Sequence, residues 1–198
     1  MNHEHFFDTT IILEDEWARF EPLEEKHFEL LLPTAMQTMI WEFTMAKIYS
    51  AADFRKYFDT ALEEKRQYKS YPFAIFDKKQ NEYLGCTRFG NVDLKNKKLE
   101  IGWTWLHPKL HGTGFNKHCK FLLLTYCFEK LQLIRVELKT SSLNLRSQKA
   151  MLKIGAVKEG TLRKNFINED GTIRDSVYFS FLDDEWPGVK KNIFKEFL

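Results

Sequence analysis

The spacing of strand-like runs in the middle of the chain limits its fold most strongly. Runs at 71–76, 83–89 and 99–106 are separated only by short polar clusters. Such clusters are typical of hairpin turns, so the three runs are expected to form an antiparallel meander. The next strand, at 134–140, is reached through a glycine-containing loop and a helix. That connection predicts a parallel pair of strands, and therefore a mixed sheet.

Periodicity and end signals place the other elements. Apolar residues at helical spacing predict helices at 23–32, ended by Pro33, and at 51–68, with Ser50 as N-cap. Further elements are expected as a strand at 17–22, helices at 115–130 and 144–154, and a hairpin of strands at 157–167 and 173–182. The order β, α, α, β, β, β, α, β, α, β, β indicates an α/β (α+β) fold. It should contain a mixed, mostly antiparallel central sheet of about seven strands, flanked by about four helices.

Length and composition fit one domain. The 198 residues, of which 43% are hydrophobic and 15% aromatic, are enough to bury a core. We expect a single domain over 1–198, with a core at about 13–183 and a C-terminal extension at 184–198. Apolar residues of the extension predict an amphipathic helix that packs on the domain or on a partner subunit, as in a homodimer; they are Val189, Ile193, Phe194 and Phe197.

Several classes of protein are disfavoured. The chain has no apolar run near the length of a membrane span and no apolar N-terminal segment typical of a secretory signal, so we expect no membrane partner. Its three cysteines, Cys86, Cys119 and Cys127, form no disulfide framework and are typical of a cytoplasmic protein. Histidines cluster at 107–118, but the sequence has no HExxH or CxxC spacing, and we expect no metal site.

Charge is distributed unevenly along the chain. The formal net charge is only +2, yet the segment 109–174 holds 13 basic and 5 acidic residues. Such a segment suits either nucleic acid or a phosphate-rich cofactor. Because acids interleave with the bases and no helix-turn-helix or RNA-recognition pattern is present, nucleic acid is the weakest of the alternatives and is not expected as a partner.

A glycine-containing loop lies inside this basic segment. Residues 106–116 read L-H-P-K-L-H-G-T-G-F-N, a strand end followed by two glycines and the start of a helix. Glycines let the backbone approach a ligand, and the N–H groups at a helix start attract anions, so the loop is typical of phosphate or pyrophosphate binding. The full Rossmann motif is not met, because Lys117 stands where its third glycine would be, and no Walker A motif is present.

Further segments extend this loop into a longer pattern. The loop itself reads K-L-H-G-T-G at 109–114, N-L-R-S follows at 144–147, K-I-G-A-V-K-E-G-T-L-R at 153–163, and R-F-E-P-L stands at 19–23. In this pattern the sequence resembles the Gcn5-related N-acetyltransferases, and within them the ribosomal-protein N-terminal acetyltransferases. The resemblance covers about 13–183 and implies the family's fold and its transfer of an acetyl group from acetyl-CoA to an amine.

The resemblance also implies partners and contacts. The acceptor would be a primary amine, on a protein N-terminus or a small molecule, that attacks the thioester directly in a ternary complex. Backbone groups at 101–105 would face the pantetheine arm, and one N–H would polarise the thioester carbonyl. Lys117, Lys120 and Arg146 could meet the 3′-phosphate of CoA as a cluster, although each alone is more typical of a solvated helix charge. Contacts with acetyl-CoA are expected from Trp103, Trp105, Lys109, Leu110, His111, Gly112, Thr113, Gly114, Phe115, Asn116, Asn144, Arg146 and Ser147.

The proton donor is where the sequence departs from its relatives. Many family members carry a Tyr where this chain has Met151, which cannot donate a proton. In the group that the chain resembles, the Ser of Asn-x-x-Ser is the proposed donor, which is Ser147 here; it could equally be a serine on a helix surface. The missing Tyr leaves a second function open, that of a non-catalytic regulatory module which binds acetyl-CoA or another nucleotide.

Glu100 is the leading candidate for the base, through a water molecule, although a solvated strand glutamate is an equal alternative. Strand alternation predicts one face with Glu100, Gly102 and Thr104, and the opposite face with Ile101, Trp103 and Trp105. Glu42, between the first two helices, is a weaker candidate. Near it, Trp41, Phe43 and Met45 would either wall the substrate cleft or pack in the core.

Overall fold

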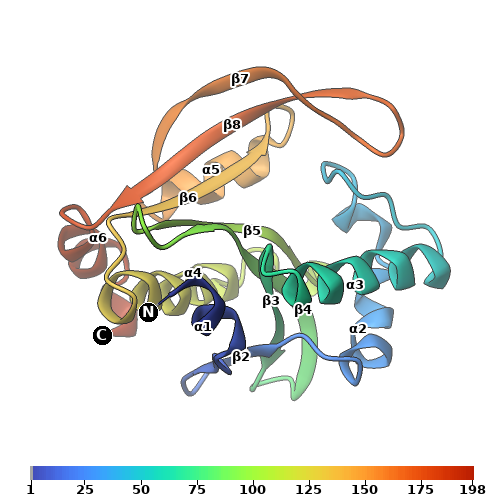
Figure 1. Ribbon diagram of the computed structural model, residues 1–198, viewed down its shortest axis with the longest axis horizontal. Helices are drawn as coiled ribbons and strands as arrows, with labels where there is room; N and C mark the ends of the chain where they lie inside the picture. Colours follow the sequence, from blue (N-terminus) through green and yellow to red (C-terminus); the bar gives the residue numbers. More distant parts are fainter. Residues whose placement is uncertain (1) are drawn as a thin grey trace.

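One eight-stranded sheet runs through the computed structural model, which describes residues 2–198 (Figure 1). The strands lie in the order β1-β2-β3-β4-β5-β6-β8-β7, and all neighbours are antiparallel except β5 and β6. They are β1 (Leu13–Glu14), β2 (Ala18–Pro22), β3 (Ser70–Asp77), β4 (Glu82–Asp93), β5 (Lys98–Leu106), β6 (Arg135–Ser141), β7 (Val157–Ile167) and β8 (Ile173–Leu182). The predicted meander and the parallel pair are confirmed, and the short β1 adds a strand to the expected seven.

Helices cover both faces of the sheet. Residues of α2 and α3 pack in one hydrophobic cluster, and residues of α1, α4 and α6 pack in another. The helices are α1 (His3–Asp8), α2 (His27–Ala35), α3 (Ala51–Arg66), α4 (Phe115–Thr125), α5 (Leu145–Lys153) and α6 (Trp186–Ile193), with short 3-10 helices η1 (Thr38–Ile40), η2 (Pro108–Leu110) and η4 (Lys195–Phe197) and a π-helical segment η3 (Tyr126–Lys130) directly after α4. Helix α1 was not expected, and its buried Phe6 and Phe7 extend the core to the N-terminal side of residue 13.

Strand alternation divides the core between the two faces. In β3, Phe73 and Ile75 belong to the cluster with α1 and α4, whereas Ala74 between them belongs to the cluster with α2 and α3. All three side chains are fully buried. A strand that is apolar on both faces is expected where helices cover both sides of a sheet.

Helix α2 differs from the sequence-based prediction at both ends. It begins at His27 instead of residue 23, because the Glu24 N–H donates to His27 Nδ1 at 3.0 Å and the chain turns there before it becomes helical. It then continues through Pro33, which lies near the end of the helix with its ring exposed. A proline at that point removes one helical hydrogen bond, and the Met36 N–H closes the helix on the Leu32 carbonyl at 3.0 Å.

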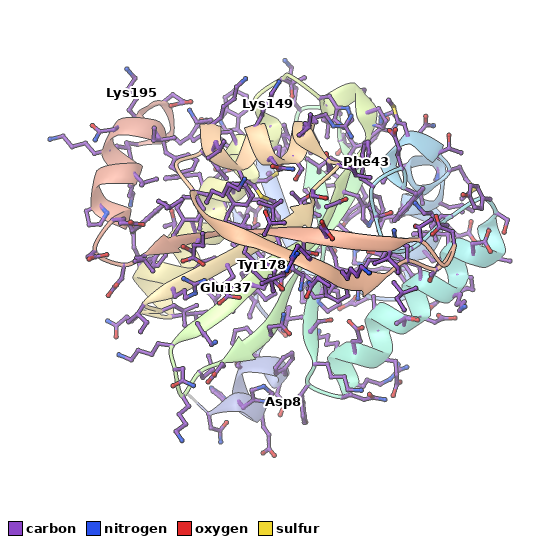
Figure 2. All side chains as sticks on the ribbon, turned by 90° about the horizontal axis from the view of Figure 1, so that it is seen from above. Asp8, Phe43, Glu137, Lys149, Tyr178 and Lys195 are labelled. Atoms are coloured by element: carbon purple, nitrogen blue, oxygen red, sulfur yellow. The ribbon has the colours of Figure 1, made fainter. Side chains whose placement is uncertain are left out.

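Two C-terminal elements shape the site. The β7–β8 hairpin crosses the molecule, with Tyr178 near its middle, and its tip reaches the segment 43–47, where the Glu169 N–H donates to the Met45 carbonyl at 3.2 Å (Figure 2). The C-terminal helix α6 packs on this same chain: Phe194, just after it, is fully buried, and Trp186 Nε1 donates to Glu129 Oε1 at 2.9 Å.

Candidate functional site

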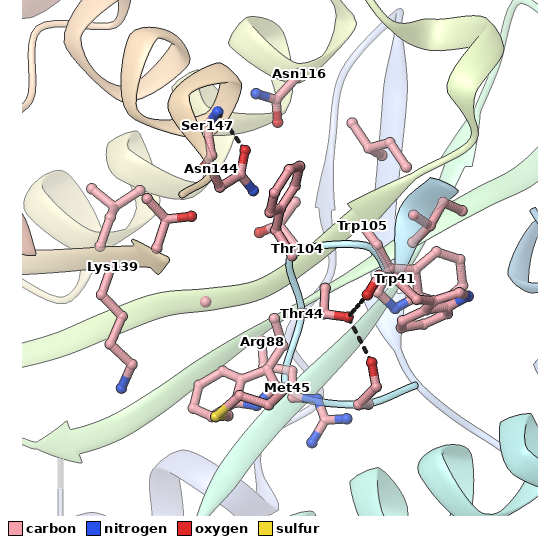
Figure 3. A pocket seen from close by; sticks show the side chains of 18 of the residues that line it. Trp41, Thr44, Met45, Arg88, Thr104, Trp105, Asn116, Lys139, Asn144 and Ser147 are labelled. Carbon is pink, nitrogen blue, oxygen red and sulfur yellow. Dashed lines mark hydrogen bonds between the residues drawn. The ribbon is translucent and has the colours of Figure 1, made fainter. Parts of the chain in front are cut away.

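The two parallel strands separate after a short paired stretch. Strands β5 and β6 pair only from Lys98 with Arg135 to Glu100 with Glu137, although they continue to Leu106 and Ser141. Their facing edges beyond this stretch therefore lack ladder partners. A pocket of about 610 Å³ opens at this gap and is lined by both strands (Figure 3).

A bulge in β5 reverses part of the predicted alternation. The register between β4 and β5 shifts between Cys86 and Arg88, opposite Trp103, whose φ is 51°. After the bulge, Trp105 packs with the α2–α3 cluster, and Thr104 turns to the α4 side, where Lys120 Nζ donates to its hydroxyl at 2.8 Å. The predicted grouping of Glu100, Gly102 and Thr104 on one face is therefore wrong. Alternation alone could not show it, because a bulge adds one residue to one strand.

The glycine-containing loop forms one end of the pocket. Gly112 and Gly114 have φ values of 77° and 88°, a backbone conformation that other residues adopt only with strain. Gly114 is the N-cap of α4, so the unpaired N–H groups of the first helical turn lie directly after the loop. Burial lowers the pKa of His111, and the nearby Arg146 lowers it further. This end of the pocket is suited to an anionic group.

Most of the expected cofactor residues line this pocket. The structure brings together Trp103, Trp105, Leu110, His111, Gly112, Gly114, Asn116, Lys117, Lys120, Asn144, Arg146 and Ser147. Three expected residues lie elsewhere. Lys109 pairs with Glu82, Thr113 Oγ1 donates to the Leu110 carbonyl at 2.8 Å, and Phe115 is buried in the core. Trp105 is also almost fully buried, so it contributes more to the core than to the pocket surface.

Helix α5 presents the Asn-x-x-Ser pair to the pocket. Asn144 is the N-cap of the helix, and its Oδ1 accepts from the Ser147 N–H at 3.0 Å. The amide nitrogen of Asn144 thus remains available to a ligand. The Ser147 hydroxyl has no hydrogen-bond partner within the described residues 2–198, and Met151 lines the pocket one turn further along.

Glu100 is buried in the pocket wall with 2% of its surface exposed. Its Oε2 accepts from Lys139 Nζ at 2.9 Å and from Asn91 Nδ2 at 2.7 Å. Its Oε1 lies against Gly102, where an added Cβ would be only 2.7 Å away. Glycine at this position therefore provides the space that the carboxylate occupies. Glu42, by contrast, is exposed and does not line the pocket.

The structure adds pocket residues that sequence reasoning missed. Arg88, Lys139 and Arg174 come from β4, β6 and β8 and line the pocket, where Arg174 Nη1 donates to the Phe43 carbonyl at 3.4 Å. Arg88 is the one charged residue between Tyr83 and Val92, and a charge in the middle of a strand was a signal of a special role. Lys120, expected as a phosphate contact, is almost completely buried, and this burial lowers its pKa to about 8.

Two further findings concern residues 2–198. They contain no group of three or more His, Cys, Asp or Glu placed to hold a metal ion. Over the same residues, none of the helices is both long enough and apolar enough to cross a membrane.

Comparison with known proteins gives consistent matches. Residues 18–157 match the family model for an acetyltransferase (GNAT) domain. The chain is 31% identical over 172 residues to the Bacillus subtilis protein named "Putative ribosomal N-acetyltransferase YdaF", which covers 84% of this chain and 89% of that protein. It is 30% identical to an Escherichia coli ribosomal-protein-serine acetyltransferase over 49% of this chain and 53% of that protein. The crystal structure of a GCN5-related N-acetyltransferase from Brucella melitensis superposes with a TM-score of 0.85 at 26% identity, covering 92% of this chain and 83% of the other.

Proposed function

Because the chain belongs to the GNAT acetyltransferase family and is an N-acetyltransferase, we propose that acetyl-CoA and the acceptor amine meet in the pocket between the separated strands. The family uses acetyl-CoA as co-substrate. With the enzyme assignment in place, no observation favours a non-catalytic regulatory module.

The separation of β5 and β6 carries this proposal. Residues 101–106 and 138–140 line the pocket and have no ladder partners across the gap between β5 and β6, and an extended pantetheine arm with its amides can pair with their backbone groups. The loop at Gly112 and Gly114 and the start of α4 would hold the pyrophosphate. Asn144 would bond the arm, and Arg146 and Lys117 would meet the phosphates. The residues of the pocket therefore fit the co-substrate.

The reaction requires two proton movements. The amine nitrogen forms a bond with the acetyl carbon, and the bond from that carbon to sulfur breaks. The proton lost by the amine passes through water to the Glu100 carboxylate, which Lys139 and Asn91 hold in place. The CoA thiolate takes a proton from the Ser147 hydroxyl, whose own proton is restored from water. A backbone N–H near the Trp103 bulge polarises the thioester carbonyl.

The acceptor is a primary amine, on a protein N-terminus or on a small molecule. The names of two relatives refer to ribosomal substrates, which supports a protein N-terminus for this chain as well. The segment at 40–48 and the β7–β8 hairpin tip enclose the side of the pocket where the acceptor would enter.

Release of CoA with a panel of amines tests the proposal. A thiol reagent such as DTNB detects the product, and the protein's own thiols should contribute little, because Cys86, Cys119 and Cys127 are buried and burial raises their pKa values. We expect at least one peptide or small amine to accelerate thiol release above the rate without acceptor. Binding of CoA without acceleration by any amine would contradict the proposed reaction. Mass spectrometry of a treated lysate then identifies the acetylated product.

A further inference from the structure

Three cationic side chains from three strands of the sheet line the same pocket. Arg88, Lys139 and Arg174, which we call the inner cations, all line it (Figure 3 labels the first two). Arg88 is almost completely buried, and the other two are partly buried. Cations removed from water at this depth need compensating negative charge.

Two of the inner cations have a carboxylate partner in the protein. Arg88 Nη1 lies 2.8 Å from Glu64 Oε2, and Lys139 Nζ lies 2.9 Å from Glu100 Oε2. Their charges are thus compensated within the chain.

Arg174 differs from both. Its Nε is buried without a hydrogen-bond partner, and its Nη1 makes only a long hydrogen bond of 3.4 Å to the Phe43 carbonyl. No carboxylate within residues 2–198 forms an ion pair with it. Burial lowers the pKa of the Arg174 guanidinium, whereas the charge of the more distant Glu100 raises it. A guanidinium in this state lacks the paired acceptors that its planar shape can bind.

The carboxylates that line the pocket are already occupied by protein donors. Asp53 accepts from the Tyr49 N–H and Ser50, Glu64 from Arg88, Glu100 from Lys139, and Glu169 from the Lys47 N–H. None of these four carboxylates forms an ion pair with Arg174, and each is held in place by its own donors. An acceptor with several positive charges, such as a polyamine, would meet the inner cations without a free counter-charge.

From these contacts we infer that the acceptor amine also carries a carboxylate, and that Arg174 binds it. This inference rests on the proposed acetyl transfer and adds the substrate class. The guanidinium offers two parallel N–H donors to a carboxylate, so it both compensates the charge and orients the acceptor. The carboxylate can be the α-carboxylate of a free amino acid or an acidic side chain near a peptide N-terminus.

Matched acceptor pairs test the inference and separate the two sources. One arm compares free amino acids with their carboxamides, and the other compares a peptide that begins Asp-Ala with one that begins Asn-Ala. CoA release gives kcat/KM for each acceptor. We expect the carboxylate member to be preferred by on the order of 10- to 100-fold in one of the two arms, the range for a hydrogen-bonded charge pair.

Variants show whether Arg174 causes the preference. Arg174→Gln should abolish it mainly through KM of the carboxylate acceptor, whereas Arg163→Gln, an exposed arginine of the same hairpin outside this pocket, should retain it. Arg174→Lys keeps the positive charge but lacks the two parallel N–H donors of the guanidinium, so it should show an intermediate preference for the carboxylate acceptor. This variant also tests the inference if Arg174→Gln does not fold.

Failure of the carboxylate inference and failure of the proposed acetyl transfer give different results. Turnover of amines with no preference in either arm, or a preference that survives both Arg174 variants, overturns the inference and leaves acetyl transfer intact. No acceleration by any amine overturns the proposed reaction and the inference with it.

Discussion

Glu100 is the residue on which the proposed proton transfer depends. Glu100→Gln keeps the size of the side chain and its bond to Asn91, but an amide cannot accept the amine proton. We expect kcat to fall by about 100-fold or more, as for loss of a general base, with the affinity for CoA unchanged. The pH–rate profile of the variant should differ from that of the wild type, because only the wild type has a carboxylate that can take the amine proton.

The matched control is Glu42→Gln, since Glu42 is exposed and outside the pocket. It should behave as the wild type. A Glu100→Gln variant with an unchanged pH–rate profile would remove Glu100 as the base.

Lys120 provides a prediction about pH and stability. Its pKa is lowered to about 8 by burial, from an ordinary value of 10.5, so the folded state binds fewer protons than the unfolded state between these values. The stability contributed by Lys120 should therefore rise with pH across this window, so the free energy of unfolding of the wild type relative to Lys120→Met should increase by about 3 kcal/mol at most. Urea denaturation from pH 7 to pH 10 measures it. Lys149→Met, at an exposed position, should retain the pH dependence of the wild type; equal slopes in all three proteins would contradict the prediction.

The sequence predicted which residues share the pocket better than it predicted their orientation. The loop glycines, Asn144 and Ser147 were found because motif spacing survives in a sequence, and they do line one pocket. The orientation of Thr104 was not predictable, because the bulge at Trp103 depends on pairing with β4. The partners of Glu100 come from Asn91 and Lys139, which only the folded sheet brings together.

At the scale of the element, the loop before α4 links backbone conformation to ligand binding. Gly114 has a φ of 88°, and a Cβ there would meet no atom within 4 Å, so the demand for glycine is conformational and not steric. Gly114→Ala should strain the loop by about 1–2 kcal/mol and weaken acetyl-CoA binding by about 5- to 30-fold. Calorimetric titration with acetyl-CoA measures the change. Gly188→Ala, in α6 with open space and no positive φ, should bind as the wild type does, and equal affinities for both variants would exclude the loop from binding.

The elements differed in how well the sequence predicted them. Helix α3 begins at its expected N-cap Ser50, and the β7–β8 hairpin follows its turn signal, because capping and turn chemistry are local. Helix α2 was placed too early and ended too soon, since a proline near a helix end costs only one hydrogen bond. Helix α1 was not predicted, because its six residues are too few to show a helical period in the sequence. Its burial also depends on Tyr71 and Phe89, which are distant in the sequence and contact Phe6.

At the scale of the whole molecule, the C-terminal segment is part of the core. Phe194 is fully buried and contacts Phe121 and Trp186 with ring centroids 5.5 and 5.9 Å away. Phe194→Ala should lower the free energy of unfolding by about 3–5 kcal/mol, as for other fully buried aromatic residues. Leu198→Ala, whose side chain is 70% exposed, should change it by less than about 0.5 kcal/mol. Similar denaturation midpoints for the two variants would show that the segment does not contribute to folding.

The short junction between β5 and β6 has a thermodynamic consequence. Only three residue pairs join β5 to β6. The facing edges of the two strands beyond these pairs are open to a molecule that can form hydrogen bonds with both. Acetyl-CoA at about 100 times its Kd should add about 2.7 kcal/mol to the stability, a rise of about 5–10 °C in Tm. Adenosine diphosphate at the same concentration, which has a pyrophosphate and no pantetheine arm, should give a much smaller rise; an equal one would show that the arm does not join the strands. The amount of folded enzyme in a cell would then follow the supply of its own co-substrate.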